Sequence, residues 1–141
     1  MFGVDTQLVR DGSYYVVEDG GEIVAAGGWS ARRTLFGGDQ YKHEADAPLD
    51  PATEPARIRA FFVHPAHARR GLGRTLFRRC ASAAFGAGFR QLELVATLPG
   101  EPLYRALGFT AVEPVPVVLP GGIVIDCLRM SRELGAADAD L

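Results

Sequence analysis

The sequence contains only two cysteines, Cys80 and Cys127, and no long apolar segment. The cysteines lie far apart and outside any CxxC or Cys/His cluster, so we expect two buried thiols and no metal site. No apolar run reaches the roughly 18 residues that a membrane span requires, and the first residues lack the pattern of a signal peptide. We therefore expect a cytoplasmic protein without a metal and without a membrane partner.

Acidic residues are absent from one long segment of the chain. Eight arginines and no Asp or Glu occur from Arg57 to Arg90, although the net charge of the whole chain is only -2. Such a segment can face nucleic acid, a phosphorylated cofactor or solvent alone, and composition leaves these three open. The length of 141 residues, 48% of them hydrophobic, suits one globular domain spanning residues 1–141.

The order of apolar runs predicts a fold of the α/β (α+β) class. Strand 57–63, helix 71–86 and strand 91–96 have the spacing of a parallel βαβ unit. We expect a mixed, mainly antiparallel sheet with this βαβ step at its centre. The other predicted elements are a hairpin of strands 14–18 and 22–29, a long loop 34–56, a short helix 101–107, strands 109–119 and 123–130, the first of them interrupted by Pro114 and Pro116, and a frayed tail from Gly135.

The junction that starts at His64, with the sequence HPAHARRGLGRTL, is rich in glycine and arginine. The helix after it begins with unpaired N–H groups at the positive end of its dipole, and Gly71 and Gly73 would let a ligand approach the backbone. The segment predicts a pyrophosphate site, and a glycine-interrupted loop with exposed arginines is the alternative. The other residues that would contribute to the site are Leu72, Arg69, Arg70 and Arg74.

This junction does not have the spacing of a nucleotide P-loop or of a Rossmann fingerprint. It resembles the signature loop of the GNAT superfamily of acyl-CoA N-acyltransferases, usually written (Q/R)xxGx(G/A). The final GxG falls on Gly71 and Gly73, and the leading Gln/Arg position falls on Ala68, which is a departure from the pattern. The resemblance implies that acetyl-CoA or coenzyme A is the co-substrate.

A second segment, Leu103 to Phe109 (LYRALGF), is similar to the aromatic-Tyr-xxx-Gly-Phe segment of the same family, with Leu103 in place of the usual aromatic residue. By this resemblance Tyr104 lies beside the coenzyme A sulfur and protonates the departing thiolate. A tyrosine suits this role because its phenol stays protonated near neutral pH and can donate to a developing negative charge. The alternative is an aromatic residue that only packs under the loop.

The resemblance also implies a gap in the central sheet. The strand that ends at Phe62 and Val63 would splay away from strand 91–96 and offer backbone groups to the pantetheine arm. Family members normally have a strand and two helices before the hairpin, but only residues 1–12 precede it here, so the N-terminal strand and a helix are expected to be missing. Either the chain is truncated or a homodimer covers the exposed edge strand.

The general base is the least defined part of the predicted site. Removing a proton from an ammonium group calls for Glu, Asp, His or a water that they hold, and the central strand offers Arg57 and Arg59 instead. His64 is favoured as a structural residue at the strand end, and Trp29 as a core residue more than as part of an acceptor pocket. The candidates considered for the base are Glu93, His64, His43 and Glu54, and those for an acceptor pocket or lid are Trp29, Tyr41 and loop 34–56.

These features together predict an N-acetyltransferase that transfers an acetyl or other acyl group from acetyl-CoA to a primary amine of a small molecule or peptide. We expect direct attack by the amine, because Cys80 lies on the apolar stripe of its helix and does not suit a nucleophile. The alternative is a non-catalytic acyl-CoA-binding or sensor domain. A nucleic-acid-binding module would need interleaved aromatic residues and a strongly basic domain, which the sequence lacks.

Overall fold

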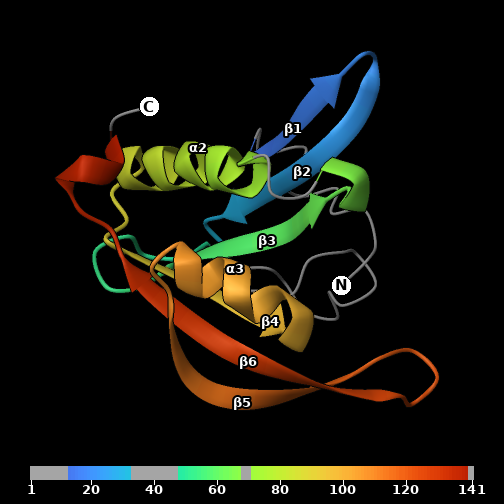
Figure 1. Ribbon diagram of the computed structural model, residues 1–141. Coiled ribbons are helices and arrows are strands. Elements are labelled where there is room, and N and C mark those ends of the chain that lie inside the picture. The colour runs from blue at the N-terminus through green and yellow to red at the C-terminus, as the bar shows by residue number, and fades with distance from the viewer. Residues whose placement is uncertain (1–12, 33–47, 68–70, 140–141) are drawn as a thin grey trace.

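The computed structural model describes residues 13–32, 48–67 and 71–139, which form a six-stranded sheet with a long helix across one face (Figure 1). The strand order is β1-β2-β3-β4-β6-β5, in which β3 and β4 pair in parallel and the other neighbours pair antiparallel. The predicted mixed sheet with one βαβ step is confirmed. The elements are β1 (Tyr14–Asp19), β2 (Glu22–Ser30), β3 (Ala56–Val63), α2 (Leu72–Gly86), β4 (Gln91–Thr97), α3 (Glu101–Ala106), β5 (Thr110–Val118), β6 (Val124–Glu133) and the short 3-10 turns η2 (Pro65–His67), η3 (Leu98–Gly100) and η4 (Ala136–Ala139).

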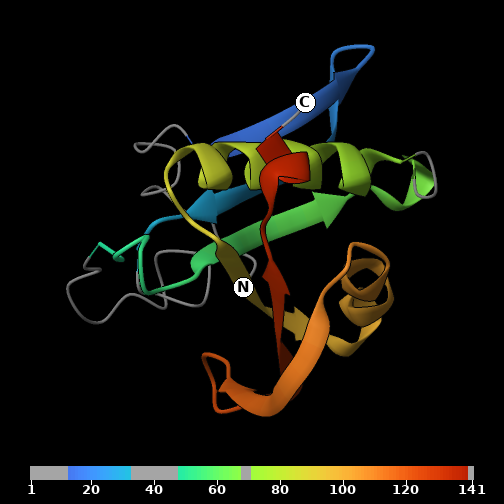
Figure 2. The ribbon, with the colours of Figure 1, turned by 90° about the vertical axis from the view of Figure 1, so that its left-hand side faces the viewer.

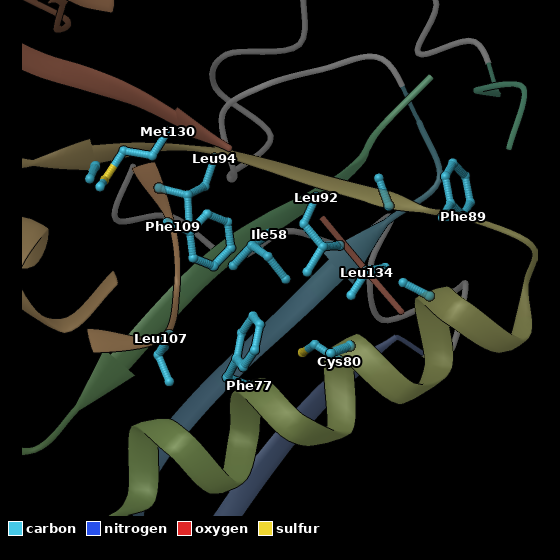
Figure 3. Close-up of a cluster of buried hydrophobic side chains, with 14 of the residues drawn as sticks. Ile58, Phe77, Cys80, Phe89, Leu92, Leu94, Leu107, Phe109, Met130 and Leu134 are labelled. Atoms are coloured by element: carbon cyan, nitrogen blue, oxygen red, sulfur yellow. The ribbon is translucent and has the colours of Figure 1, made fainter. Parts of the chain in front are cut away.

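The core lies between α2 and one face of the sheet, as Figure 3 shows. Phe77 and Cys80 of α2 point toward Ile58 of β3 and Leu92 of β4, all of them almost fully buried. The apolar residues on α2 recur at helical spacing and those on β4 at every second position, so each element buries one face. This packing fixes the start of α2 at the end of β3.

The parallel pair β3–β4 is joined only at its beginning. The paired residues are Ala56 with Leu92 and Arg57 with Glu93, after which the ladder ends. Beyond this point β3 stays paired with β2 and β4 with β6, so the two strands diverge, as Figure 2 shows. The splay that the family resemblance implied is therefore present.

A β-bulge in β3 accompanies this divergence. Gly28 pairs with Arg59 and Ala26 with Phe62, so one intervening residue of β2 lies opposite two of β3. An extra residue bends the strand that contains it and increases its local twist. The bend turns the second half of β3 away from β4.

The C-terminal part departs from the prediction in three ways. Strand β5 runs through Pro114 and Pro116 without interruption, because it is the last strand of the described sheet and prolines are tolerated at an edge. Strand β6 continues to Glu133, three residues past its predicted end at Met130. The tail forms η4 and packs on α2, where Ser82 Oγ donates to the Ala139 carbonyl oxygen at 3.3 Å.

Residues 1–12, on which the predicted loss of an N-terminal strand and helix depends, lie outside the described residues, as does most of the predicted loop 34–56. The part of that loop that is described is anchored to the fold, since Leu49 is buried and Pro48 forms a bridge with Arg32. No helix in the described part of the chain is long and apolar enough to span a membrane.

Candidate active site

The first turn of α2 presents free backbone donors. Gly71 forms the N-cap with φ of 76°, a left-handed conformation that a residue with a side chain adopts only with strain. No side chain caps the helix, and its first turn contains no acidic residue. The first N–H to find an acceptor is that of Thr75, 3.0 Å from the Gly71 carbonyl oxygen. The N–H groups before it have no partner within the helix and can bind an anion.

The start of α2, the end of β3 and helix α3 meet at Gly73. A Cβ on this buried glycine would lie 3.3 Å from Leu103 Cδ2 and 3.8 Å from Val63 Cγ2. The absent side chain lets α2 approach α3 closely. This close approach brings Val63, Gly73 and the helix that contains Tyr104 together at the end of β3, where β3 has diverged from β4.

Tyr104 lies at the centre of an aromatic group. Its ring packs edge to face against Phe61 of β3 and Phe109, with ring centroids 6.4 and 6.0 Å away. Burial, with a smaller effect of nearby Cys80, raises the pKa of Tyr104 to about 12. The phenol therefore remains protonated throughout the physiological pH range. A Cβ on Gly100 would stand 3.4 Å from Tyr104 Cε2 and 3.5 Å from Thr97 Oγ1, so both side chains border this glycine.

The other predicted cofactor-binding residues differ in their exposure and in their backbone pairing. The side chain of Phe62 is 50% exposed and its backbone pairs with Ala26 of β2. Arg74 is exposed and lines a cavity of about 310 Å³ beside α2. Arg69 and Arg70 lie outside the described residues, so their predicted role in binding is not tested.

The sequence matches the profile of the Acetyltransferase (GNAT) family over residues 4–109, which is most of the chain. The chain belongs to the GNAT family of acetyltransferases. The matched range includes the α2 junction and the Tyr104 segment. The site described above suits acetyl-CoA, the co-substrate of GNAT enzymes, because the first turn of α2 offers free N–H groups and the β3–β4 pairing ends after Arg57 and Glu93.

Solved structures give the same fold. Ard1 from Thermoplasma volcanium matches with a TM-score of 0.67 at 18% identity, over 92% of this chain and 77% of that chain. A ribosomal-protein-alanine N-acetyltransferase from Brucella melitensis matches with a TM-score of 0.64 at 20% identity, over 92% and 74%. A GNAT phosphinothricin acetyltransferase from Sinorhizobium meliloti, solved with acetyl-CoA, matches with a TM-score of 0.64 at 22% identity, over 92% and 65%. No significant sequence match is found among curated proteins.

This GNAT protein is an acetyl-CoA-dependent acyltransferase by family. Its candidates for the general base differ in their surroundings. His64 Nδ1 accepts a hydrogen bond from the Ala66 N–H at 3.1 Å and so stabilises the turn after β3. Glu54 Oε1 accepts from the Asp50 N–H at 3.0 Å in another turn. His43 lies outside the described residues.

Glu93, the remaining candidate, belongs to a row of charges on the face of the GNAT sheet opposite α2. Its carboxylate lies 3.2 Å from Arg57 Nη1 and 3.5 Å from Arg129 Nη1, and Arg129 Nη2 lies 3.0 Å from Glu113. The four residues come from β3, β4, β6 and β5, which are adjacent in the sheet. This row cannot be predicted from the sequence, because only the register of the strands brings these residues together.

The two cysteines of this acyltransferase lie in the interior. Cys80 is completely buried, and burial raises the pKa of its thiol to about 12. Burial also raises the pKa of Cys127. A thiol that stays protonated is a poor nucleophile, which argues against a covalent cysteine intermediate. The described residues contain no group of three or more His, Cys, Asp or Glu side chains that could hold a metal ion.

Trp29 packs into the core of the GNAT fold. Its ring meets Phe89 edge to face at 6.2 Å, and its Nε1–H donates to the Tyr15 hydroxyl at 3.3 Å. One side of Trp29 also lines a cavity of about 330 Å³ with Arg32 and Pro48. Tyr41, the other predicted acceptor-pocket residue, lies outside the described residues.

Proposed function

We propose that this acyltransferase transfers an acetyl group from acetyl-CoA to a primary amine by direct attack of the neutral amine on the thioester. The observation that carries the proposal is the position of Tyr104, which lies in the splay of β3 and β4, next to the Phe61 ring at the bulge of β3. Beyond Arg57 and Glu93 the facing edges of β3 and β4 are not paired with each other, so their backbone groups can bind an extended thioester. Tyr104 brings a hydroxyl group to the ring of Phe61 on β3.

Tyr104 is assigned the role of general acid. The amine nitrogen forms a bond to the thioester carbon and the carbon–sulfur bond breaks. The Tyr104 hydroxyl then gives its proton to the departing sulfur and recovers one from solvent, while the amine releases its extra proton to water. The raised pKa of Tyr104 favours this role because the hydroxyl carries a proton at every physiological pH.

The first turn of α2 is assigned the pyrophosphate of coenzyme A. Gly71 leaves the backbone open at the N-cap, and the N–H groups of Leu72, Gly73 and Arg74 point toward the N-terminal end of the helix, the positive end of its dipole. The Arg74 guanidinium adds a positive charge. Phe62 and Val63, at the end of the diverging strand β3, are assigned to the pantetheine arm through their backbone groups.

The binding test compares two glycines that share a backbone conformation. Gly71 and Gly121 both have positive φ, 76° and 92°, and a Cβ on either would meet nothing within 4 Å. We expect calorimetric titration to show saturable binding of acetyl-CoA that Gly71→Glu abolishes and Gly121→Glu retains. Equal losses in both variants would indicate a general effect on folding and count against the pyrophosphate assignment.

The catalytic test follows thiol release over a panel of primary amines. We expect Tyr104→Phe to lower kcat by about 100-fold or more, the usual range for loss of a general acid, while the Kd for acetyl-CoA changes little. Turnover without any effect of Tyr104→Phe would refute the assignment of the acid. Binding without turnover of any amine would favour the sensor alternative, which the comparisons do not support.

The acceptor is proposed to be a primary amine of a peptide or of a small molecule. The similar structures include enzymes named for a ribosomal-protein alanine and for phosphinothricin, so both peptide and small-molecule amines belong in the panel. A homodimer that covers the β1 edge, a single domain over residues 1–141 and a cytoplasmic location stay predictions from the sequence.

A further inference from the structure

A cavity of about 310 Å³ lies beside α2 and extends from its first turn, which contains the proposed pyrophosphate site, into the turns that follow. Three arginines line it: Arg74 and Arg78 from α2 and Arg132 from β6. Arg74 and Arg78 are four residues apart, so they lie on the same side of the helix about 6 Å apart along its axis. The cavity therefore continues from the start of α2 along one face of the helix.

The charge of this cavity is not balanced by its own residues. The one acidic side chain in its lining is Asp138, which lies 3.1 Å from Arg132 Nη1 and accepts from the Gly135 N–H at 2.8 Å. Helix α2 contains no acidic residue. Three guanidinium groups and one carboxylate leave an excess of two positive charges in the cavity. Because Arg74 and Arg78 are like charges four residues apart, they also destabilise helix α2 slightly.

Apolar contacts hold the cavity in shape. Phe77 and Leu107, both almost fully buried, form part of its wall, and the Arg132 guanidinium lies 4.9 Å above the Phe77 ring. The 3-10 turn η4 packs on α2 and carries Asp138, which orients Arg132. A packed wall with the Arg132 guanidinium held in place suits a compact anion better than a flexible surface does.

We propose that this cavity binds the 3′-phosphate of coenzyme A, which makes the enzyme selective for the phosphorylated nucleotide. A phosphate monoester carries nearly two negative charges at neutral pH and so matches the excess charge of the cavity. The proposal rests on the function proposed above, since Arg74 is shared between the pyrophosphate site and the cavity. Arg78 and Arg132 would contact the 3′-phosphate alone.

The test compares the binding of acetyl-CoA with that of acetyl-dephospho-CoA, which lacks only the 3′-phosphate. We expect calorimetry to give at least tenfold tighter binding of acetyl-CoA to the unmodified protein. Arg78→Gln and Arg132→Gln should each remove most of this preference and leave the Kd for acetyl-dephospho-CoA unchanged. Arg74→Gln should weaken both ligands.

Arg79→Gln is the matched control. Arg79 is adjacent to Arg78 on the same helix, but its guanidinium lies 5.2 Å above the Tyr15 ring and does not line the cavity. We expect this variant to keep the full preference. Equal affinities for the two thioesters in the unmodified protein would overturn the proposal, and so would an Arg79→Gln effect as large as that of Arg78→Gln.

A second ligand pair separates this proposal from the proposed function. If neither thioester binds, the acetyl-CoA-dependent function itself fails. The cavity is then tested with 3′-phosphoadenosine 5′-phosphate against adenosine 5′-phosphate, which differ in the same group. Tighter binding of the first that is lost in Arg78→Gln would support the cavity, and equal binding would refute it.

Discussion

Gly27 lies directly against the ring of Phe61, so that a Cβ on this glycine would stand 2.5 Å from Phe61 Cδ1. Phe61 lies at the bulge of β3, and its ring in turn packs against Tyr104. The missing side chain of Gly27 thus allows the ring to lie flat on β2. The position of the proposed general acid depends on this close approach.

Gly27→Ala should therefore both destabilise the protein and displace Tyr104. Overpacking of this kind costs about 1–3 kcal/mol, because the backbone or the ring must move. We expect a lower urea midpoint and a lower kcat, with a smaller effect on the Kd for acetyl-CoA. Gly86→Ala in α2 is the control, since its Cβ would meet nothing within 4 Å and alanine favours a helix. A fully stable Gly27→Ala variant would contradict the packing described here.

Stability at high pH should depend on Tyr104 and Cys80. The pKa of Tyr104 is about 12 instead of 10, and that of Cys80 about 12 instead of 9, chiefly because of burial. The contribution of these two groups to the free energy of unfolding is complete at pH values below their pKa in the unfolded chain. It is lost as pH rises toward 12, because the unfolded chain releases these protons at lower pH than the folded protein does. We expect urea unfolding to show stability falling above pH 9, by about 1.4 kcal/mol per pH unit for each group.

Tyr104→Phe should make this decline shallower between pH 10 and 12, because one group with a raised pKa is removed. The ultraviolet absorbance of phenolate offers a second readout. In the unmodified protein Tyr104 should ionise late, and that step should vanish in Tyr104→Phe. An identical slope and an identical absorbance titration in both proteins would show that Tyr104 is not buried as described.

The local parts of the site could be predicted from the sequence. Gly71 and Gly73 precede an amphipathic helix, and Tyr104 lies at a fixed spacing before Gly108, so each signal is contained within a few residues. The parallel β3–β4 step was also predicted, from the βαβ spacing. The functional roles assigned to these residues stay predictions until binding and turnover are measured.

The parts that depend on strand register could not be predicted. The bulge of β3 appears only when Arg59 and Phe62 are aligned with β2, and a single sequence does not give that alignment. Pro114 and Pro116 predicted an interruption because prolines disfavour a central strand, whereas β5 is an edge strand. The position of a strand in the sheet is a tertiary property.

The two prolines of β5 should limit self-association at this edge. They are paired opposite Leu128 and Asp126 of β6, two residues apart, so both remove N–H groups from the same outer side of the strand. We expect the double substitution of Pro114 and Pro116 by Thr to increase dimer or aggregate formation in light scattering. Pro120→Thr, in the turn between β5 and β6, should not. If the double variant associates no more than the unmodified protein, the two prolines are not what limits self-association at this edge.

Arg57, Glu93, Arg129 and Glu113 form the row of charges on the sheet. Removing one charge from this row should lower the stability of the protein by an amount that depends on which residue is changed. The side chains of Arg57 and Glu93 are each only 12% exposed, and burial lowers the pKa of Arg57 because its charge is poorly solvated. Arg57 Nε and Nη1 are buried without a well-aligned hydrogen bond, so the guanidinium depends on the charge of Glu93. Glu93, in contrast, retains Arg129 when Arg57 is removed.

We therefore expect Glu93→Gln to lower the free energy of unfolding by about 3 kcal/mol, the usual cost of leaving one partner of a buried pair. Arg57→Met should cost much less, because it removes the poorly solvated charge itself. The control is Glu101→Gln, which breaks an ion pair with Arg105 that is shorter, at 2.6 Å, but whose side chains are 28% and 51% exposed. Urea unfolding should show a loss of at most about 0.5 kcal/mol there. Equal losses of stability for Glu93→Gln and Arg57→Met would show that the two charges stabilise each other symmetrically. A loss for Glu101→Gln as large as that for Glu93→Gln would show that burial does not set the strength of these ion pairs.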